Sequence, residues 1–176
     1  MRPIDTKNWR GFLFADLFKI VKGTRLTRAK MTCGGINYIG ATAFNNGVTA
    51  KIGNQDHIHP AGTITVCYNG SIGKAFFQTK PFWATDDVNV LYPKFNLTPN
   101  IAKYLCTIIS KLGLKYAYVD KWTANKMSNT IIKLPTTADN QPDWEYMEKY
   151  IQQIERKVKD NILLINECLN SETSNV

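Results

Sequence analysis

A seven-residue repeat of apolar side chains near the C-terminus is the feature that most constrains this chain. The repeat places Trp144, Ile151, Val158 and Ile165 at one position, and Met147, Ile154, Asn161 and Cys168 at the other. Such a repeat predicts one coiled-coil-type helix from about Asp143 to Leu169, about 40 Å long at 1.5 Å per residue. Because Ile162, Leu163 and Leu164 add more apolar surface than a lone surface helix needs, we expect this helix to pack on another helix.

Antiparallel pairing of this helix with its own copy is the first interpretation of the repeat. The pairing would bury a dimerisation stripe made of Met147, Ile151, Ile154, Val158, Asn161, Ile162 and Ile165. An asparagine in such a stripe costs stability but favours one register. Two alternatives stay open: the stripe folds back on its own domain, or it docks on a helix of a partner subunit.

The segment before the helix has the composition and charge of a basic globular domain. A polar, proline-flanked segment, Thr136–Pro142, is expected to act as a hinge, so that 1–138 forms the domain and 139–176 the hinge and helix. Residues 1–138 contain 18 Lys and Arg against 6 Asp and Glu, a net charge of +12, whereas 139–176 contains 4 against 8, a net charge of −4. A basic domain attracts phosphate backbones, although anionic lipid or an acidic protein would be attracted too.

The centre of this domain has the pattern of a β-hairpin. Thr63–Tyr68 alternates in the manner of a half-buried strand rich in β-branched residues, and Lys74–Phe77 resumes an extended pattern. Between them, Asn69-Gly70 and Gly73 are the residues that most readily adopt positive φ. We therefore expect Gly70 or Gly73 to occupy the left-handed region at a tight turn.

Helical patterns flank this hairpin, and the chain as a whole is expected to be α+β, with a twisted mixed β-sheet and packed helices. Trp9–Val21 is interpreted as a short strand followed by one helical turn. Thr98 and Pro99 have the properties of an N-cap and a first helical residue, and Gly113 is the expected C-cap of the helix that they begin.

Three groups of polar and cationic residues are candidate DNA contacts. The densest basic segment combines cations with a hydroxyl group and contributes Lys22, Arg25, Thr27, Arg28 and Lys30. Turns that contain glycine contribute Asn45, Asn46, Asn69, Ser71 and Lys74. The third group interleaves lysine with an aromatic ring and contributes Lys121, Trp122 and Lys126. Each group also has a plainer interpretation, as a solvated loop, as turn formers, or as a buried aromatic with lysines at the surface.

Signatures of catalysis, cofactors and metals are missing from the sequence. It contains no phosphate-binding loop, no Gly-x-Gly-x-x-Gly fingerprint and no Gly-x-Ser-x-Gly elbow, so we expect neither a catalytic centre nor a cofactor. His57 and His59 lack an evident third ligand, and no Cys-x-x-Cys pair occurs, so no metal site is expected. No apolar run reaches the length of a membrane span and no signal peptide is evident at the N-terminus, so a cytoplasmic protein is expected.

The order of several short motifs resembles the specificity subunit of type I restriction-modification systems, and still more the shorter recognition subunits of type IIB systems. The resemblance covers nearly the whole chain and rests on Trp9–Gly23, Gly35–Ile39, Asn45–Val48, Gly62–Gly73, Leu97–Pro99 and Ile132–Pro135. One departure is Gln141–Glu148, which opens the long helix where type I subunits usually have a Glu-Gln pair, and this segment looks like the type IIB form.

The resemblance implies a target recognition domain followed by a spacer helix. A full specificity subunit carries two of each, so this chain would be half a subunit that reads double-stranded DNA while separate methyltransferase and restriction subunits do the chemistry. The helix would then span roughly 12 base pairs. Two other functions were weighed: an RNA-binding regulator, because Gly70–Gly73 matches a Gly-x-x-Gly loop, and a stand-alone nuclease that uses His57, His59, Asp86 and Asp87.

Overall fold

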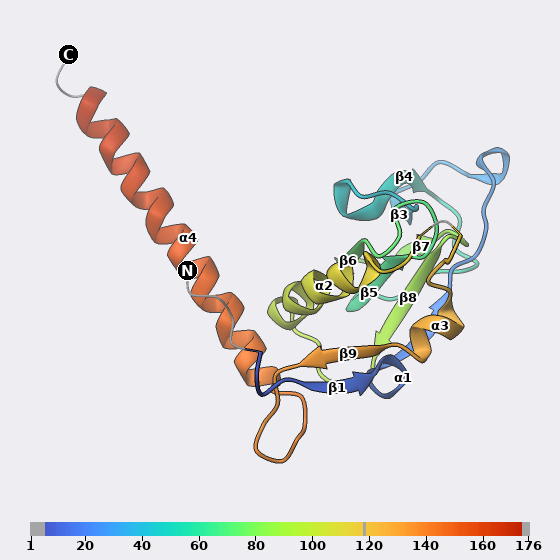
Figure 1. The fold of residues 1–176 in the computed structure, drawn as a ribbon. Helices are drawn as coiled ribbons and strands as arrows, with labels where there is room; N and C mark the ends of the chain where they lie inside the picture. Colours follow the sequence, from blue (N-terminus) through green and yellow to red (C-terminus); the bar gives the residue numbers. More distant parts are fainter. Residues whose placement is uncertain (1–5, 118, 174–176) are drawn as a thin grey trace.

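A computed structural model describes residues 6–117 and 119–173, with side chains described as far as residue 167 in the last helix. The side chain of Cys168, which the repeat places at the seam, lies outside the described residues. Figure 1 shows a domain of mixed strands and helices from which one long helix extends. The strands are β1 (Arg10–Leu13), β2 (Phe18–Lys22), β3 (Ile36–Ile39), β4 (Val48–Ile52), β5 (Thr63–Cys67), β6 (Ala75–Gln78), β7 (Phe82–Ala84), β8 (Val88–Pro93) and β9 (Ile131–Leu134). The helices are α1 (Phe14–Leu17), α2 (Pro99–Gly113), α3 (Ala124–Ser128) and α4 (Trp144–Thr173).

The strands form three small sheets. The largest has the order β2-β8-β5-β6 and is antiparallel throughout. In the second, β3 pairs antiparallel with β4 and parallel with β7, and the third pairs β1 with β9. The α+β class with mixed strand pairing is therefore confirmed, with the strands divided among three sheets. Within the described residues, no helix is both long enough and apolar enough to cross a membrane.

The hairpin and the first helical segment follow the sequence patterns closely. β5 and β6 form the expected antiparallel pair, and both Gly70 and Gly73 adopt positive φ, of 65° and 80°. At the N-terminus, the predicted strand and helical turn correspond to β1 and α1, and a second strand, β2, follows directly. These elements form as predicted because turn and alternation signals are local properties of the chain.

The main hydrophobic core lies where α2 packs against the hairpin and β9. Thr98 caps this helix as predicted, since its side chain accepts a hydrogen bond from the Ile101 N–H at 3.2 Å. Leu105 and Ile109 are fully buried, and burial of each side chain contributes about 1.5–3 kcal/mol. α2 thereby holds the hairpin in a fixed position relative to the rest of the domain.

The glycine at the end of α2 has a different role from the one predicted. The helix ends at Gly113, which does not adopt positive φ, and the C-cap is the next residue, Leu114, in the right-handed region with φ −62°. Instead, a Cβ atom at Gly113 would lie 2.2 Å from the Cα atom of Gly73. Glycine is needed here because the helix end and the hairpin turn touch backbone to backbone.

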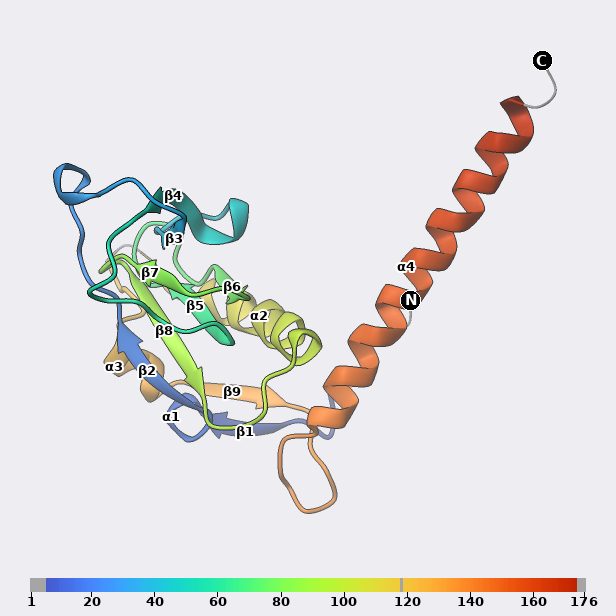
Figure 2. The same cartoon turned by 180° about the vertical axis from the view of Figure 1, so that it is seen from behind.

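The first turns of α4 are fixed to the domain, and the rest of the helix extends away from it (Figure 2). Trp144 stacks on Phe95 with ring centroids 3.9 Å apart, and Met147 is fully buried. Glu148 accepts hydrogen bonds from Thr98 at the start of α2 and from the side-chain amide of Asn100. The orientation of α4 relative to the domain is therefore set by packing and hydrogen bonds.

Candidate nucleic-acid interface

One end of the four-stranded sheet collects several of the predicted contact residues. In the sheet register, Lys22 pairs with Asn89 and Cys67 pairs with Val88, so the end of β2, the hairpin turn 68–74 and the turn 85–87 are neighbours. Lys74 is exposed and Ser71 half-buried in the hairpin turn. The structure thus brings residues from the first two predicted groups to the same end of the sheet.

This end of the sheet carries charges of both signs. The ammonium group of Lys22 lies 5.6 Å from the centre of the Tyr68 ring. Hydrogen bonding to Tyr68 raises the pKa of Lys22, and the nearby charges of Asp86 and Asp87 raise it further. The side-chain amide of Asn69 donates a hydrogen bond to Asp87 at 2.8 Å. Asn69 therefore holds the two turns together, and the two aspartates reduce the positive potential at this end.

The basic loop, residues 23–35, has a backbone that is fastened at three points. The Trp83 ring N–H donates to the Thr24 carbonyl at 2.7 Å. The Tyr38 hydroxyl donates to the Leu26 carbonyl at 3.2 Å, and the Asn54 amide donates to the Lys30 carbonyl at 3.1 Å. The backbone of the loop is thus held in place by hydrogen bonds to the rest of the domain.

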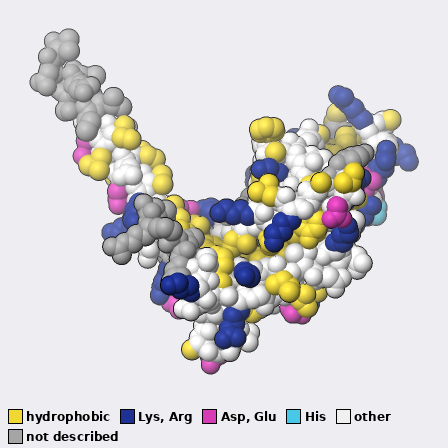
Figure 3. Space-filling view, in the orientation of Figure 1, with side chains coloured by type: hydrophobic (Ala, Val, Ile, Leu, Met, Phe, Trp, Pro, Cys, Tyr) yellow, Lys and Arg dark blue, Asp and Glu magenta, His cyan; other side chains and the backbone are white. Residues whose placement is uncertain are grey.

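The side chains of the basic loop point in two directions. Leu26 and Met31 pack on a small core of Tyr38, Ile52 and Trp83. The predicted contact residues of the loop are all exposed: Arg25, Thr27, Arg28 and Lys30. None of the three cations among them forms an ion pair with any described residue. Figure 3 shows Lys and Arg side chains gathered at the end of the domain that carries the basic loop. Positive charge is therefore presented on an ordered backbone.

The sequence around the basic loop is free of acidic residues over a long stretch. No Asp or Glu occurs between Asp16 and Asp56, while this stretch contains Lys19, Lys22, Arg25, Arg28, Lys30 and Lys51. This stretch of the sequence therefore carries a net charge of +6, which attracts a polyanionic ligand.

Asn45 and Asn46 are turn formers in the connection between β3 and β4, in agreement with their plainer interpretation. Both adopt positive φ, of 49° and 51°. The Asn45 amide donates to the Val48 carbonyl at 3.0 Å, and the Asn46 amide donates to the Phe77 carbonyl at 3.1 Å. These amide groups are engaged within the protein, so a role in reading bases through them is not favoured.

Trp122 is a predicted DNA contact that the structure contradicts. Its side chain is fully buried and stacks on Tyr116 with ring centroids 4.9 Å apart. Its ring N–H donates to the Thr130 hydroxyl at 2.9 Å, so both its face and its polar atom are occupied. Of its two neighbours, Lys126 forms an ion pair with Asp120, and Lys121 is half-buried. Of the third predicted group, Trp122 is therefore structural, and Lys121 and Lys126 stay predicted contacts.

The dimerisation stripe is divided between the protein core and the surface. Met147 is contradicted as a dimer contact, because it is fully buried in the core of its own chain. Ile151 is half-buried against the same core, and Ile154 is half-buried. The remaining members of the stripe are exposed: Val158, Asn161, Ile162 and Ile165. Figure 3 shows hydrophobic side chains along this part of α4. The first part of the stripe therefore packs on its own domain, which was one of the two alternatives to self-pairing.

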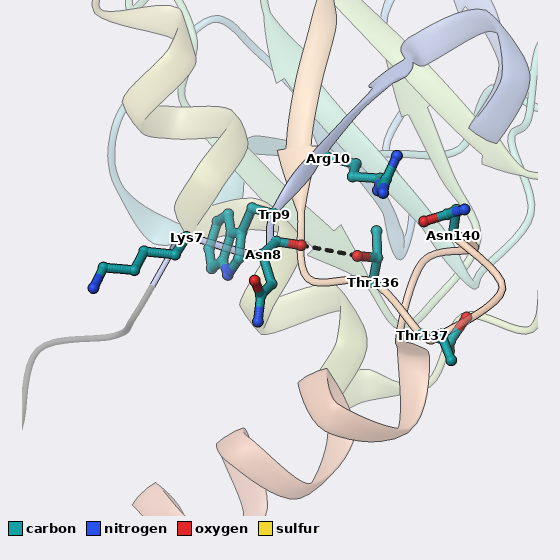
Figure 4. A pocket seen from close by; sticks show the side chains of 8 residues that line it. Lys7, Asn8, Trp9, Arg10, Thr136, Thr137 and Asn140 are labelled. Carbon is teal, nitrogen blue, oxygen red and sulfur yellow. Dashed lines mark hydrogen bonds between the residues drawn. The ribbon is translucent and has the colours of Figure 1, made fainter.

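The segment expected to be a hinge forms a closed loop. The Thr137 N–H donates to the Gln141 carbonyl at 2.9 Å, and the Asp143 N–H donates to the Pro135 carbonyl at 2.9 Å. Figure 4 shows the Thr136 hydroxyl pointing at the Asn8 carbonyl, to which it donates at 2.8 Å. An open depression of about 610 Å³ lies beside this loop, lined mainly by polar and cationic residues that include Lys7 and Arg10. The loop therefore fixes the start of α4.

The residues of the nuclease hypothesis have structural partners. His59 lies with its Nδ1 atom 2.6 Å from the Tyr92 hydroxyl and stacks on Phe82, and its burial lowers its pKa. His57 packs edge-on against Trp83. Among residues 6–117 and 119–173, no group of three or more His, Cys, Asp or Glu side chains is placed to hold a metal ion.

Comparison with known proteins identifies the family. Residues 6–164 match the model of the type I restriction modification DNA specificity domain. This match covers most of the chain, so the chain belongs to that family. The resemblance inferred from the sequence motifs is confirmed.

Individual relatives support the same assignment. The chain is 36% identical over 161 residues to the specificity subunit S.BcgI of a type II restriction enzyme from Heyndrickxia coagulans, a match that covers 90% of this chain and 47% of that protein. It also resembles the HsdS subunit from Thermoanaerobacter tengcongensis, with a TM-score of 0.62 and 14% identity over 90% of this chain and 40% of that one. The S subunit of a type I system from M. genitalium gives a TM-score of 0.60 and 14% identity over 91% and 43% of the two chains. At 14% identity these structures support the fold alone, and the chain spans about half the length of its relatives or somewhat less.

Several important residues were not singled out from the sequence. Trp83, Tyr38 and Asn54 fasten the basic loop, and Gln78 fastens the connection between β3 and β4. These partners lie 12 to 59 residues from the atoms that they bind, so no local pattern reveals them. The exposed Phe44 was also not singled out, although the sequence offered one indication of its position. It directly precedes two turn-forming asparagines, and residues beside a tight turn are commonly at the surface.

Proposed function

We propose that this chain is a sequence-specific recognition subunit for double-stranded DNA, which directs separate methyltransferase and restriction subunits to their site. The observation that carries the proposal is the basic loop, where Arg25, Arg28 and Lys30 are exposed on a fastened backbone and form no ion pair with any residue that the structure describes. Such cations can bind phosphate groups without first breaking an ion pair. The backbone that carries them is already ordered, so binding does not have to order it. Membership of the DNA specificity domain family supports the same assignment.

The proposed functional unit is a dimer formed through the exposed part of α4. Val158, Ile162 and Ile165 are each more than half exposed, which leaves an apolar surface that no described residue of the chain covers. The chain covers 47% of S.BcgI and 40–43% of the two S subunits of known structure, so two copies match the length of such a relative. An antiparallel pair would hold two identical domains over a two-fold site with a fixed spacer.

Salt-dependent binding of duplex DNA tests the recognition role. The chain is titrated with a random 30-base-pair duplex and with duplexes enriched from a random library by repeated selection on the chain. Loss of a phosphate contact in Arg25→Ala or Arg28→Ala should weaken binding to both and reduce the salt slope by about one. Loss of a base contact should weaken binding to the enriched duplexes only, by about 1–3 kcal/mol. Lys133→Ala, at an exposed cation on β9, is the matched control.

Three outcomes would contradict the proposal. A parent chain that binds no duplex, or that enriches no sequence, is not a DNA-reading subunit. Variants that bind like the parent would show that the basic loop is merely solvated. Tighter binding to single-stranded RNA than to duplex DNA would favour an RNA-binding regulator instead.

A further inference from the structure

An exposed aromatic side chain projects from the connection between β3 and β4. Phe44 is 79% exposed, although phenylalanine is ordinarily among the most buried residues. In Figures 1 and 2 this connection and the basic loop both lie at the end of the domain farthest from β1 and β9, on opposite sides of the three-stranded sheet. Figure 3 shows a hydrophobic protrusion over this connection.

The backbone on both sides of Phe44 is held rigidly. On its C-terminal side, Asn46 donates to the Phe77 carbonyl, and the buried Gln78 side chain donates back to the Asn46 carbonyl at 3.1 Å. Gly47, with φ 80°, fits against Ile39 so closely that a Cβ atom would lie 3.0 Å from that side chain. On its N-terminal side, the Phe44 N–H donates to the Thr42 hydroxyl at 3.3 Å. The ring is therefore presented to solvent by an ordered turn.

The segment that carries Phe44 contains no negative charge that would repel an anionic ligand, and the exposed ring suits a ligand that also offers apolar surface. The connection and β4 contain no acidic residue, and Lys51 is their only charged side chain. Duplex DNA has both properties, because phosphates line its grooves while base edges and thymine methyl groups form the groove floor. A rigid aromatic residue gains most from such a contact because little conformational entropy is lost on binding.

We propose that Phe44 is a specificity-determining residue that places its ring against bases in a groove of the DNA, while the cations of the basic loop hold the phosphates. This inference rests on the proposed DNA-recognition function and adds an apolar base contact to it. Asn45 and Asn46 then act as positioning residues for the ring, through their positive φ and their backbone hydrogen bonds.

Binding of Phe44 variants to the two duplex pools described above tests this role. We expect Phe44→Ala to bind the enriched duplexes about 10-fold or more weakly than the parent, with less than about a 2-fold change on the random duplex. Phe44→Leu, which keeps an apolar side chain, should recover part of the lost affinity. Ile131→Thr, at an exposed apolar residue on β9, is the matched control and should bind like the parent.

Two further measurements identify the base contact. Replacement of thymine by deoxyuridine in the enriched duplexes should weaken the parent but not Phe44→Ala if the ring lies on a thymine methyl group. Enhanced permanganate reactivity of a thymine in the parent complex, absent with Phe44→Ala, would indicate that the ring enters a base step and unstacks it. Thermal melts of all variants should match the parent, because the ring is outside the core.

The outcomes separate this inference from the proposed function. A parent that binds no duplex or enriches no sequence overturns both. A parent that enriches a sequence, with Phe44→Ala binding both pools like the parent, overturns the inference and leaves the function intact. Equal loss on both pools would also overturn it, since a base-reading contact must distinguish sequences.

Discussion

The two halves of α4 continue one apolar repeat but lie in opposite surroundings. In the first turns, Met147 is buried against the domain, and Tyr150 packs edge-on against Tyr104 with ring centroids 5.7 Å apart. Farther along, Val158 and Ile162 are 51% and 53% exposed. The repeat runs across both halves, so it specifies a helix with an apolar face without specifying what covers that face.

The difference arises from the way α2 meets α4. Glu148 near the base of α4 binds Thr98 and Asn100 at the start of α2, and Glu155 two turns later forms an ion pair with Lys103. Beyond this point the two helices diverge (Figure 1). Crossing helices touch over only a few turns, so the domain covers the base of α4 and leaves the described residues beyond it exposed.

The largest expected effect is the loss of self-association on changing the exposed half. Val158→Asp combined with Ile162→Asp would bury two carboxylates in the proposed dimer interface, and we expect the dimer to weaken at least about 100-fold. Sedimentation at micromolar concentration measures this change. Domain stability should stay within about 0.5 kcal/mol of the parent because both residues are exposed in the single chain.

A polar residue on the outer side of the same helix supplies the control for this experiment. Gln153→Asp adds a carboxylate outside the repeat and should leave self-association unchanged. A parent that stays monomeric, or a double variant that stays dimeric, would rule out pairing through the exposed half. Docking of this half on a partner subunit would then be the remaining interpretation.

Truncation of the buried half should have the reverse effect. Met147→Ala removes a fully buried side chain, and we expect the free energy of unfolding to fall by about 2–5 kcal/mol. Urea unfolding measures the loss, and Ile162→Ala is the matched variant in the exposed half. Equal losses from these two substitutions would show that the division of α4 into a docked and a free half is wrong.

Features set by local chemistry could be predicted from the sequence, and this explains the success with the hairpin and the start of α2. Gly70 and Gly73 adopt positive φ and Thr98 caps the helix, because the signals lie within a few residues of the structures that they specify. The long helix was predicted for the same reason, since its repeat is visible along one segment.

Features set by distant partners could not be predicted in this way. The burial of Trp122 depends on Phe14, more than a hundred residues earlier in the chain, and the burial of Met147 depends on α2. The basic loop could be found by its charge, but its order depends on Trp83 and Tyr38. The role of Gly113 was misassigned because its close neighbour, Gly73, belongs to another element.

The contact between those two glycines provides a further test, because α2 is the surface on which the base of α4 docks. A Cβ atom on Gly73 would lie 2.3 Å from the Cα atom of Gly113, at a residue with φ 80°. We expect Gly73→Ala to destabilise the fold by about 1–3 kcal/mol, because the turn and the helix end must separate. Gly70→Ala, where φ is also positive but the nearest atom is 3.1 Å away, should cost less, about 1 kcal/mol. Equal melting temperatures for the two variants would contradict a specific role for the glycine contact.

The smallest expected effect concerns the pH dependence of docking. Hydrogen bonding from Thr98, aided by that from Asn100, lowers the pKa of Glu148 from its ordinary value near 4.5. A carboxyl group whose pKa is lower in the folded state stabilises the fold fully above its ordinary pKa and loses this contribution as the pH falls through the lowered value.

We therefore expect acid to weaken the packing of the base of α4 on the domain before it changes the exposed half of the helix. Tryptophan fluorescence should report the change, because Trp144 is stacked on Phe95 at the docked end. In Glu148→Gln, docking should be weaker at pH 7 and less dependent on pH below about 4.5, with the difference from the parent kept small because the carboxylate is only half-buried and is partly screened by solvent. Identical acid midpoints in the parent and the variant would mean that apolar packing around Met147 and Trp144 holds the helix without help from Glu148.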